Sequence, residues 1–234
     1  SLWVLAGWGA VGVLVALLVL PETRVPQTDR NFIQAFAIYG KMATDRVYLP
    51  TALGMACLIS VMFGFEVLGP FYIQTDLHHG PIFYGHLPFL LGCMWLAGNF
   101  TNRLVSTHVK VITIITVAAG VALLISVTML ALDFSGVFNV LALVLPAGVI
   151  YFLMAMIWPN GYSTCLGRFQ DAGGSANALV SGLFIIVSAT FSAAASLLHS
   201  ATGWPLWLLY IFVTAGTLVC FRGFLRKEFD YRVE

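Results

Sequence analysis

The sequence has 234 residues, of which 60% are hydrophobic and only 9% are charged, and its formal net charge at pH 7 is +1. A mean hydropathy of +0.94 lies far outside the range of soluble domains. These values exclude a soluble globular protein, and the near-neutral charge gives no sign of a nucleic-acid partner. We therefore expect an all-α integral membrane protein whose surroundings are the lipid bilayer.

Seven stretches of the sequence are apolar over roughly 20 residues each. A helix that rises about 1.5 Å per residue needs this length to cross the hydrocarbon core of a bilayer. In chain order, the predicted spans are residues 2–20, 52–74, 84–101, 111–132, 136–158, 175–198 and 204–224. We interpret these seven stretches as transmembrane helices.

Basic residues divide the connections between these spans into two alternating sets. All 11 Lys and Arg residues lie after the first, third or fifth span, or at the end of or after the seventh, whereas residues 75–83, 133–135 and 199–203 contain none. Under the positive-inside rule the basic set faces the cytoplasm. We therefore expect a cytoplasmic C-terminus and an outward-facing Ser1.

The first span lacks the basic region and cleavage site of a signal peptide. Residues 1–20 are interpreted as the last transmembrane helix of a preceding N-terminal half, and residues 21–51 as a cytoplasmic linker bounded by proline residues. Apolar residues within the linker recur at helical spacing, which predicts a short amphipathic helix along the membrane face, with an irregular linker as the alternative. These apolar residues are Phe32, Ile33, Phe36, Tyr39 and Ala43.

The second span carries Glu66, the only acidic residue within any predicted span. An acid near mid-membrane costs about 2.5 to 3.5 kcal/mol on the translocon scale, so it usually faces a bundle interior, a cavity or a partner. Counting from Ala52, Glu66 lies roughly 21 Å across, in the outer half of a core about 30 Å thick. We predict that it binds a proton or a cationic substrate, with a protonated, hydrogen-bonded structural Glu as the alternative.

The helix around Glu66 contains Gly69 and Pro70, which predict a hinge, although Gly and Pro are also frequent in ordinary membrane helices. Phe63 is predicted to line a tolerant apolar cavity beside Glu66. Other aromatic residues of the spans are candidates for the same cavity, although most must pack or face lipid: Phe71, Tyr72, Trp95 and Tyr151.

No metal site or cofactor is predicted. Four acidic or imidazole side chains follow the second span without a regular register, which argues against metal ligands: Asp76, His78, His79 and His86. The four widely spaced cysteines are interpreted as single thiols rather than disulfides, and Cys165 is placed in a short loop.

The fifth and sixth spans carry two further patterns. Trp158 is predicted to be an interfacial anchor, and residues 159–161 to form a turn at the inner face. In the sixth span, Gly174 and Ala178 belong to a small-residue face that predicts close packing between helices. Asn177 beside them is a candidate gate or cavity residue.

Five segments resemble the major facilitator superfamily, most closely its Bcr/CflA drug-resistance branch. They are LVLPETR at 18–24, SVMFGFEVLGPFYIQ at 60–74, FYG at 83–85, GNFTNRLV at 98–105 and DAGGSANALVSGLF at 171–184. The resemblance implies that the seven spans are the sixth to twelfth of twelve helices, with residues 52–234 forming the C-terminal six-helix bundle and a cytoplasmic tail. It also implies a missing N-terminal half of the same chain and a bacterial-type inner membrane.

The resemblance assigns Gly98, Asn102 and Arg103 to a degenerate gating loop. In the family's stronger copy of this motif an acidic residue occupies the position of Asn102, and here the amide can donate and accept hydrogen bonds but carries no charge. Arg103 can pair with a carboxylate or a helix C-terminus from the other half. A simple positive-inside anchor is the alternative for Arg103.

Together, these features predict a secondary active transporter that exports amphipathic or cationic small molecules by alternating access, with protons as the coupling partner. An uncoupled facilitator or a metabolite or siderophore exporter of the same superfamily is the alternative within the class. A membrane-embedded enzyme is disfavoured because no histidine lies well inside a span. A structural half-bundle that functions with a partner is a further alternative.

Overall fold

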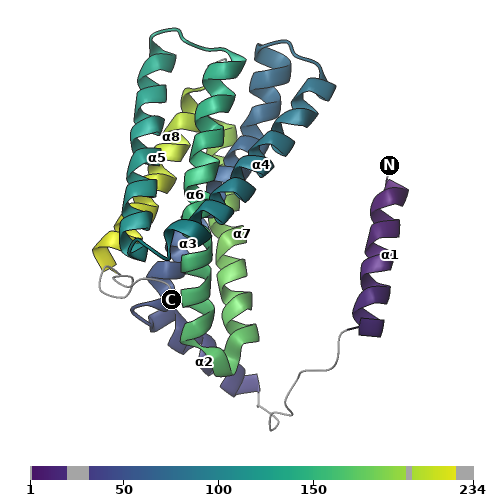
Figure 1. Cartoon of the computed structure of the whole chain (residues 1–234), viewed down its shortest axis with the longest axis vertical. Helices are drawn as coiled ribbons and strands as arrows, with labels where there is room; N and C mark the ends of the chain where they lie inside the picture. Colours follow the sequence, from purple (N-terminus) through teal and green to yellow (C-terminus); the bar gives the residue numbers. More distant parts are fainter. Residues whose placement is uncertain (1, 20–31, 199–201, 225–234) are drawn as a thin grey trace. The chain divides into compact units, whose positions relative to one another are not determined.

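The computed structural model describes residues 2–19, 32–198 and 202–224 and divides the chain into two units, Ser1–Ala35 and Phe36–Glu234. The first unit contains α1, Leu2–Val19, which is apolar on all sides, as is typical of a helix surrounded by lipid. The described residues contain no strand (Figure 1). The remaining helices are α2 (Phe32–Thr44), α3 (Tyr48–Pro70), α4 (Pro81–Val105), α5 (Val111–Phe134), α6 (Val140–Arg168), α7 (Gly173–Leu197) and α8 (Trp204–Leu218).

Seven helical segments in the described residues are long and apolar enough to cross a membrane. This confirms the prediction of a multi-pass, all-helical membrane protein. The physical reason is that lipid offers no hydrogen-bond partner, so each backbone N–H must bond within its own segment. Two segments continue as π-helices, η1 (Phe71–Asp76) after α3 and η3 (Val219–Phe224) after α8, and a short 3-10 turn, η2 (Gln170–Ala172), precedes α7.

Helix α3 lies at the centre of the second unit. In the 18-residue window of its span, 61% of the residues are buried, against 17% in α4 and α7. Gly64 permits one of its close contacts, because a Cβ at this position would collide with Leu209 of α8. The core around α3 contains large, fully buried aromatic side chains from α3, η1 and α8: Phe65, Tyr72, Trp207 and Tyr210.

Several serine and threonine hydroxyl groups inside the spans are satisfied within their own helix, whereas the buried hydroxyls of Tyr72 and Tyr210 have no hydrogen-bond partner among the described residues. Ser60, Ser126 and Thr214 each donate to the carbonyl four residues earlier, at 2.8, 2.8 and 2.6 Å. Such bonds remove the cost of a buried donor without a partner helix. Ser60 also lies 3.2 Å from the hydroxyl of Ser188, which links α3 to α7.

Two of the boundaries that differ from the sequence prediction change the place of named residues. Helix α3 begins at Tyr48 rather than at residue 52, so Pro50 lies in its first turn, where a missing N–H is tolerated. Helix α6 continues to Arg168, so the predicted turn at residues 159–161 is wrong, and Cys165 lies in this helix rather than in a loop. The helix passes through Pro159 because neighbouring elements pack against it there, as membrane helices allow.

The helix predicted in the linker is present as α2, but its buried side differs from the prediction. Met42 is fully buried and Tyr39 is half-buried, whereas Phe36 is 67% exposed. The bundle-facing side is therefore the Tyr39 and Met42 side. Residues 20–31 and 225–234, which hold the first part of the predicted linker and the predicted tail, lie outside the described residues.

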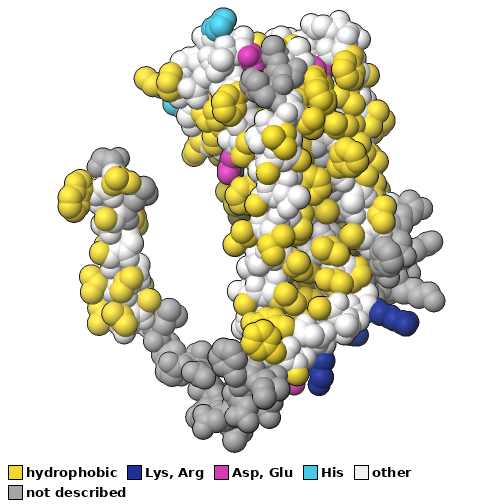
Figure 2. Space-filling model, turned by 180° about the vertical axis from the view of Figure 1, so that it is seen from behind, with side chains coloured by type: hydrophobic (Ala, Val, Ile, Leu, Met, Phe, Trp, Pro, Cys, Tyr) yellow, Lys and Arg dark blue, Asp and Glu magenta, His cyan; other side chains and the backbone are white. Residues whose placement is uncertain are grey.

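Charged side chains gather at the two ends of the bundle. In the view of Figure 2, the Lys and Arg side chains lie at one end and the His side chains at the opposite end. This is the separation that the alternating basic connections predict. The side of the membrane that each end faces stays a prediction.

Candidate functional site

Glu66 lies on the outward side of α3, away from the buried core. Its side chain is exposed, and Phe63, one turn earlier, is 41% exposed on the same side. Within the described residues the Glu66 carboxylate has no hydrogen-bond partner. The face of α3 that carries Phe63 and Glu66 is therefore exposed among the described residues, while the opposite face of α3 packs in the core.

Two tyrosines from other helices approach Glu66. The hydroxyl of Tyr151 on α6 donates to the backbone carbonyl of Met62, one turn before Glu66, at 3.2 Å. Tyr151 of α6 and Tyr84 of α4 both lie close enough to Glu66 for the carboxylate to interact electrostatically with their hydroxyl groups. Helices α3, α4 and α6 thus place one carboxylate and two phenol groups close together.

A row of aromatic side chains continues from Tyr151 along α6, and we call Tyr151, Trp158 and Tyr162 the aromatic row. Their spacing of seven and four residues keeps them on one side of the helix. The rings of Trp158 and Tyr162 are stacked at 5.6 Å between centroids. Trp95 of α4 packs edge-on against both Tyr151 and Trp158, at 6.4 and 6.0 Å.

Helix α7 closes the other side of the aromatic row. Phe184 lies 5.3 Å from Trp158 between ring centroids, and the hydroxyl of Tyr162 donates to the side-chain oxygen of Asn177 at 2.5 Å. A chain of contacts therefore runs from the α3 turn beside Glu66 along α6 to Asn177. Phe63 is on the exposed side of α3 but makes none of the ring contacts in this chain.

The aromatic row gives Trp158 a packing role that the sequence interpretation did not include, and its role as an interfacial anchor stays a prediction. The residue lies inside α6, about ten residues before the helix ends at Arg168, and its ring contacts Trp95, Tyr162 and Phe184. Sequence reasoning missed this role because Pro159 was taken as a helix end. The spacing of Tyr151, Trp158 and Tyr162 was the signal that would have indicated a common face.

Gly98 and Asn102 lie within α4 rather than in a loop, and they mark the place where α4 crosses α6. A Cβ at Gly98 would collide with the backbone oxygen of Phe152. One turn later, the buried side-chain oxygen of Asn102 accepts a hydrogen bond of 3.0 Å from the amide of Asn160. Arg103 follows in the same turn with an exposed side chain, and its gating role stays a prediction.

The remaining predicted site residues have different surroundings. Gly69 is buried, and a Cβ there would lie 3.3 Å from the ring of Tyr84. Pro70 stands where α3 passes into η1. At Gly174 no described atom lies within 4 Å of such a Cβ, and Ala178 is exposed. The small-residue face of α7 is therefore open here, and its packing against another helix stays a prediction.

An ion pair closes the end of the bundle where α3 begins. The Arg168 guanidinium donates to one oxygen of Asp45 at 3.2 and 3.3 Å, and the other oxygen accepts from the backbone N–H groups of Val47 and Tyr48. Partial burial would raise the pKa of Asp45, but these backbone bonds and Arg168 together hold it below its ordinary value. The Tyr48 hydroxyl also donates to the Ala176 carbonyl at 2.5 Å.

Asp133 is a buried acid that the sequence analysis assigned to a connection. It lies in the last turn of α5 with 5% of its surface exposed, and one carboxylate oxygen accepts from the N–H of Gly203 at 3.0 Å. Gly203 precedes α8, so the negative charge stands at a helix N-terminus, where it is favourable. Glu66 is therefore not the only acid in the observed spans, since α5 includes Asp133 and η1 ends at Asp76.

Among the described residues, no three His, Cys, Asp or Glu side chains come together as metal ligands, and the four cysteines are free thiols. A comparison with models of protein families finds no match to this chain. A comparison with curated proteins also finds none.

Proposed function

We propose that this chain is the C-terminal portion of a secondary active transporter of the major facilitator type that exports amphipathic or cationic small molecules in exchange for protons. The observation that carries the proposal is the exposed Glu66 in an apolar span, one helical turn from the α3 carbonyl that Tyr151 contacts. An exposed acid in a lipid-facing position is costly, so a polar space or a partner must cover it.

The chemistry around Glu66 suits a cation that is partly apolar. A carboxylate neutralises the charge of such a molecule, and aromatic faces attract cations, with Trp the strongest of them. Trp95 and Trp158 lie in the chain of ring contacts that begins at Tyr151. A protonated Glu66 would lack the charge that holds the cation, so this carboxyl binds either a proton or the cation, and uptake of one releases the other.

Open surfaces on α4 and α7 support a second helical bundle as the partner that covers this face. Both helices have only 17% of their span window buried within the described residues. Gly174 and Ala178 would let a facing helix approach closely, because small residues permit backbone contact in membranes. The exposed Arg103 is placed to pair with an acid of such a partner.

In this proposal the protein resides in a bacterial-type inner membrane with its C-terminus in the cytoplasm. The basic end of the bundle supports this orientation through the positive-inside rule. An enzyme receives less support, since the titratable groups that share the Glu66 region are tyrosines and no histidine is among them.

The experiment is efflux of a cationic dye from vesicles that contain the intact protein, with and without a pH gradient. Glu66→Gln should abolish the acceleration by the gradient, and Asp171→Asn, which removes an exposed acid outside the apolar part of the spans, should not. Gradient-dependent efflux that survives in Glu66→Gln would remove Glu66 from the coupling path. Efflux that is insensitive to pH in the unaltered protein would favour the uncoupled alternative.

A further inference from the structure

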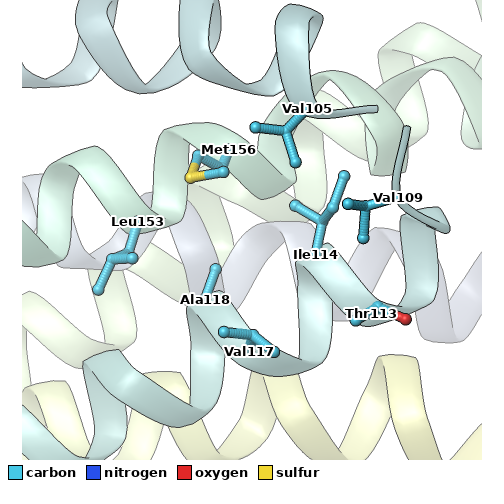
Figure 3. A pocket seen from close by; sticks show the side chains of 8 residues that line it. All are labelled: Val105, Val109, Thr113, Ile114, Val117, Ala118, Leu153 and Met156. Carbon is cyan, nitrogen blue, oxygen red and sulfur yellow. The ribbon is translucent and has the colours of Figure 1, made fainter. Parts of the chain in front are cut away.

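Three buried oxygen atoms without a hydrogen-bond partner lie at one end of the bundle, apart from its apolar pocket. That pocket, of about 180 Å³ between α4, α5 and α6, has Thr113 as the only polar side chain in its lining (Figure 3). The three oxygens belong to Tyr72 and Asp76 of η1 and to Asp133 of α5. A buried oxygen without a partner costs free energy, so three of them together point to a ligand.

Asp133 and Tyr72 come together beside Gly203, where α8 begins. One carboxylate oxygen of Asp133 accepts from the Gly203 N–H at 3.0 Å, and the other oxygen has no partner among the described residues. A Cβ at Gly203 would lie 3.2 Å from Asp133 Oδ1 and 3.3 Å from the ring of Phe138. The Phe138 ring packs edge-on against Tyr72, with 5.9 Å between the centroids. These contacts bring the end of α5, η1 and the start of α8 to one place.

Asp76 adds a second carboxylate from the same segment as Tyr72, and we call Asp76 and Asp133 the acid pair. In η1 the Leu77 N–H donates to the Tyr72 carbonyl, five residues earlier, at 2.9 Å, so Tyr72 and Asp76 are about one turn apart on the same side. The Tyr72 hydroxyl interacts electrostatically with both carboxylates. Tyr72 is fully buried and Asp133 is 5% exposed, so bulk water does not solvate their unpartnered oxygens.

The connections at this end of the bundle contain no Lys or Arg that could neutralise the acid pair. Residues 75–83, 133–135 and 199–203 lack both residue types, and Figure 2 shows the Lys and Arg side chains at the opposite end. Histidines of these connections are mostly neutral at pH 7. Two ionised carboxylates beside one buried hydroxyl repel each other, and burial increases this cost. The start of α8 offsets part of the Asp133 charge, and a cation from solution can offset the rest.

We infer that the acid pair binds one Ca²⁺ ion, with the Tyr72 hydroxyl oxygen as a further ligand. All of these donors are oxygens, which hard cations prefer and soft metals do not. A divalent ion matches the two carboxylates, whereas a monovalent ion or a water molecule would leave a buried charge uncompensated. Ca²⁺ suits the place better than Mg²⁺, because its coordination is flexible and Mg²⁺ requires an octahedron. Spacing along the sequence could not reveal this pair, because Asp76 and Asp133 come from different helical segments.

The test is isothermal titration calorimetry of Ca²⁺ into the 234-residue chain in detergent at pH 7, together with thermal unfolding. We expect one Ca²⁺ per chain with a Kd of about 10⁻⁴ to 10⁻³ M, and an unfolding temperature that rises as Ca²⁺ is added. Asp76→Asn and Asp133→Asn should each weaken binding about tenfold or more. Asp133→Asn keeps an oxygen that can accept from Gly203. Asp45→Asn removes a partly buried carboxylate that pairs with Arg168 at the basic end, and it should leave Ca²⁺ binding unchanged.

Tyr72→Phe separates a ligand from a structural hydroxyl. It removes only a hydroxyl that has no partner among the described residues, so it should weaken Ca²⁺ binding without lowering the unfolding temperature in the absence of Ca²⁺. Tyr210→Phe removes an equally buried, unpartnered hydroxyl from α8 and should leave binding unchanged. Binding that survives both Asp→Asn variants would overturn the inference, and so would equal stabilisation by NaCl at the same ionic strength. Stabilisation by acid with no effect of Ca²⁺ would mean that the acid pair shares a proton instead, and would also overturn it.

Discussion

The side-chain amide of Asn160 on α6 donates to the side-chain oxygen of Asn102 on α4 at 3.0 Å, and to the Met156 carbonyl of its own helix at 3.1 Å. Both asparagines are buried, with 5% of their surface exposed. The bond therefore joins two helices at a place where neither side chain has water as an alternative hydrogen-bond partner. One turn earlier on α4, Gly98 packs closely against the backbone of α6, so the two helices are joined there by a hydrogen bond and by a close contact.

We predict that Asn160→Ala destabilises the contact between α4 and α6. Interhelical hydrogen bonds in membranes contribute about 0.6 kcal/mol on average and up to about 1.7 kcal/mol. The measurement is unfolding in mixed micelles followed by circular dichroism, for Asn160→Ala, Asn102→Ala and the double variant. A coupling energy near zero in this cycle would contradict the prediction, because the two losses would then be independent.

Gly98 provides a second test of the same crossing. Gly98→Ala places a methyl group against the Phe152 carbonyl and the Ala155 side chain, so the helices must separate. Overpacking of this kind costs about 1 to 3 kcal/mol. Gly92→Ala on the same helix is the control, since no described atom lies within 4 Å of the added group. Equal unfolding free energies for the two variants would refute the close packing at Gly98.

The end of the bundle near Asp45 is predicted to lose stability in acid. The pKa of Asp45 is lower in the folded chain than its ordinary value of 3.8. The carboxylate therefore contributes stability at pH values above about 4, and this contribution disappears as the pH falls through the lower folded pKa. Asp45→Asn should remove this pH dependence. Unfolding curves of the two proteins that stay parallel between pH 6 and pH 2 would contradict the prediction.

Two substitutions at Asp45 separate its two roles. Asp45→Asn weakens the pair with Arg168 but keeps an oxygen that can accept from Val47 and Tyr48, so it should cost about 0.2 to 1 kcal/mol. Asp45→Ala also removes the oxygen that accepts from the N–H groups of Val47 and Tyr48, and it should cost about 0.5 to 2 kcal/mol more. Thermal unfolding at pH 7 checks the order, and equal losses would mean that these two backbone hydrogen bonds contribute nothing.

The aromatic row leads to a prediction about binding that depends on the proposed function. Trp158→Leu should weaken the binding of an amphipathic cationic dye by about 2- to 30-fold, the range of cation–π energies, and Trp158→Phe should recover part of the loss. Phe212→Leu removes an aromatic ring that is 60% exposed on α8 and serves as the control. Dye binding to the purified chain by fluorescence anisotropy measures this, and unchanged affinity in Trp158→Leu would exclude the row from the binding site.

The helices could be predicted from the sequence, but several contacts at the site could not. Apolar length alone identifies a span, because lipid makes an incomplete helix too costly. Whether a helix passes through Pro159 depends on Asn102 and the other groups packed beside it, which a local pattern does not contain. The exposure of Glu66 and the burial of Asp133 likewise depend on which helices meet. In the sequence, Glu66 stands inside an apolar run and Asp133 stands directly after one.

Glu66 and Asp133 are predicted to respond to substitution in opposite ways. Asp133→Ala removes the acceptor for the Gly203 N–H and leaves a buried donor unpaired, which costs about 1 to 3 kcal/mol. Glu66→Gln should change the unfolding free energy by less than about 0.5 kcal/mol, because the side chain is exposed and has no hydrogen-bond partner among the described residues. Hydrogen exchange at the start of α8 should accelerate in Asp133→Ala only. If Glu66→Gln destabilised the chain as strongly as Asp133→Ala, Glu66 would be a structural residue, and its proposed role in proton and cation exchange would lose its basis.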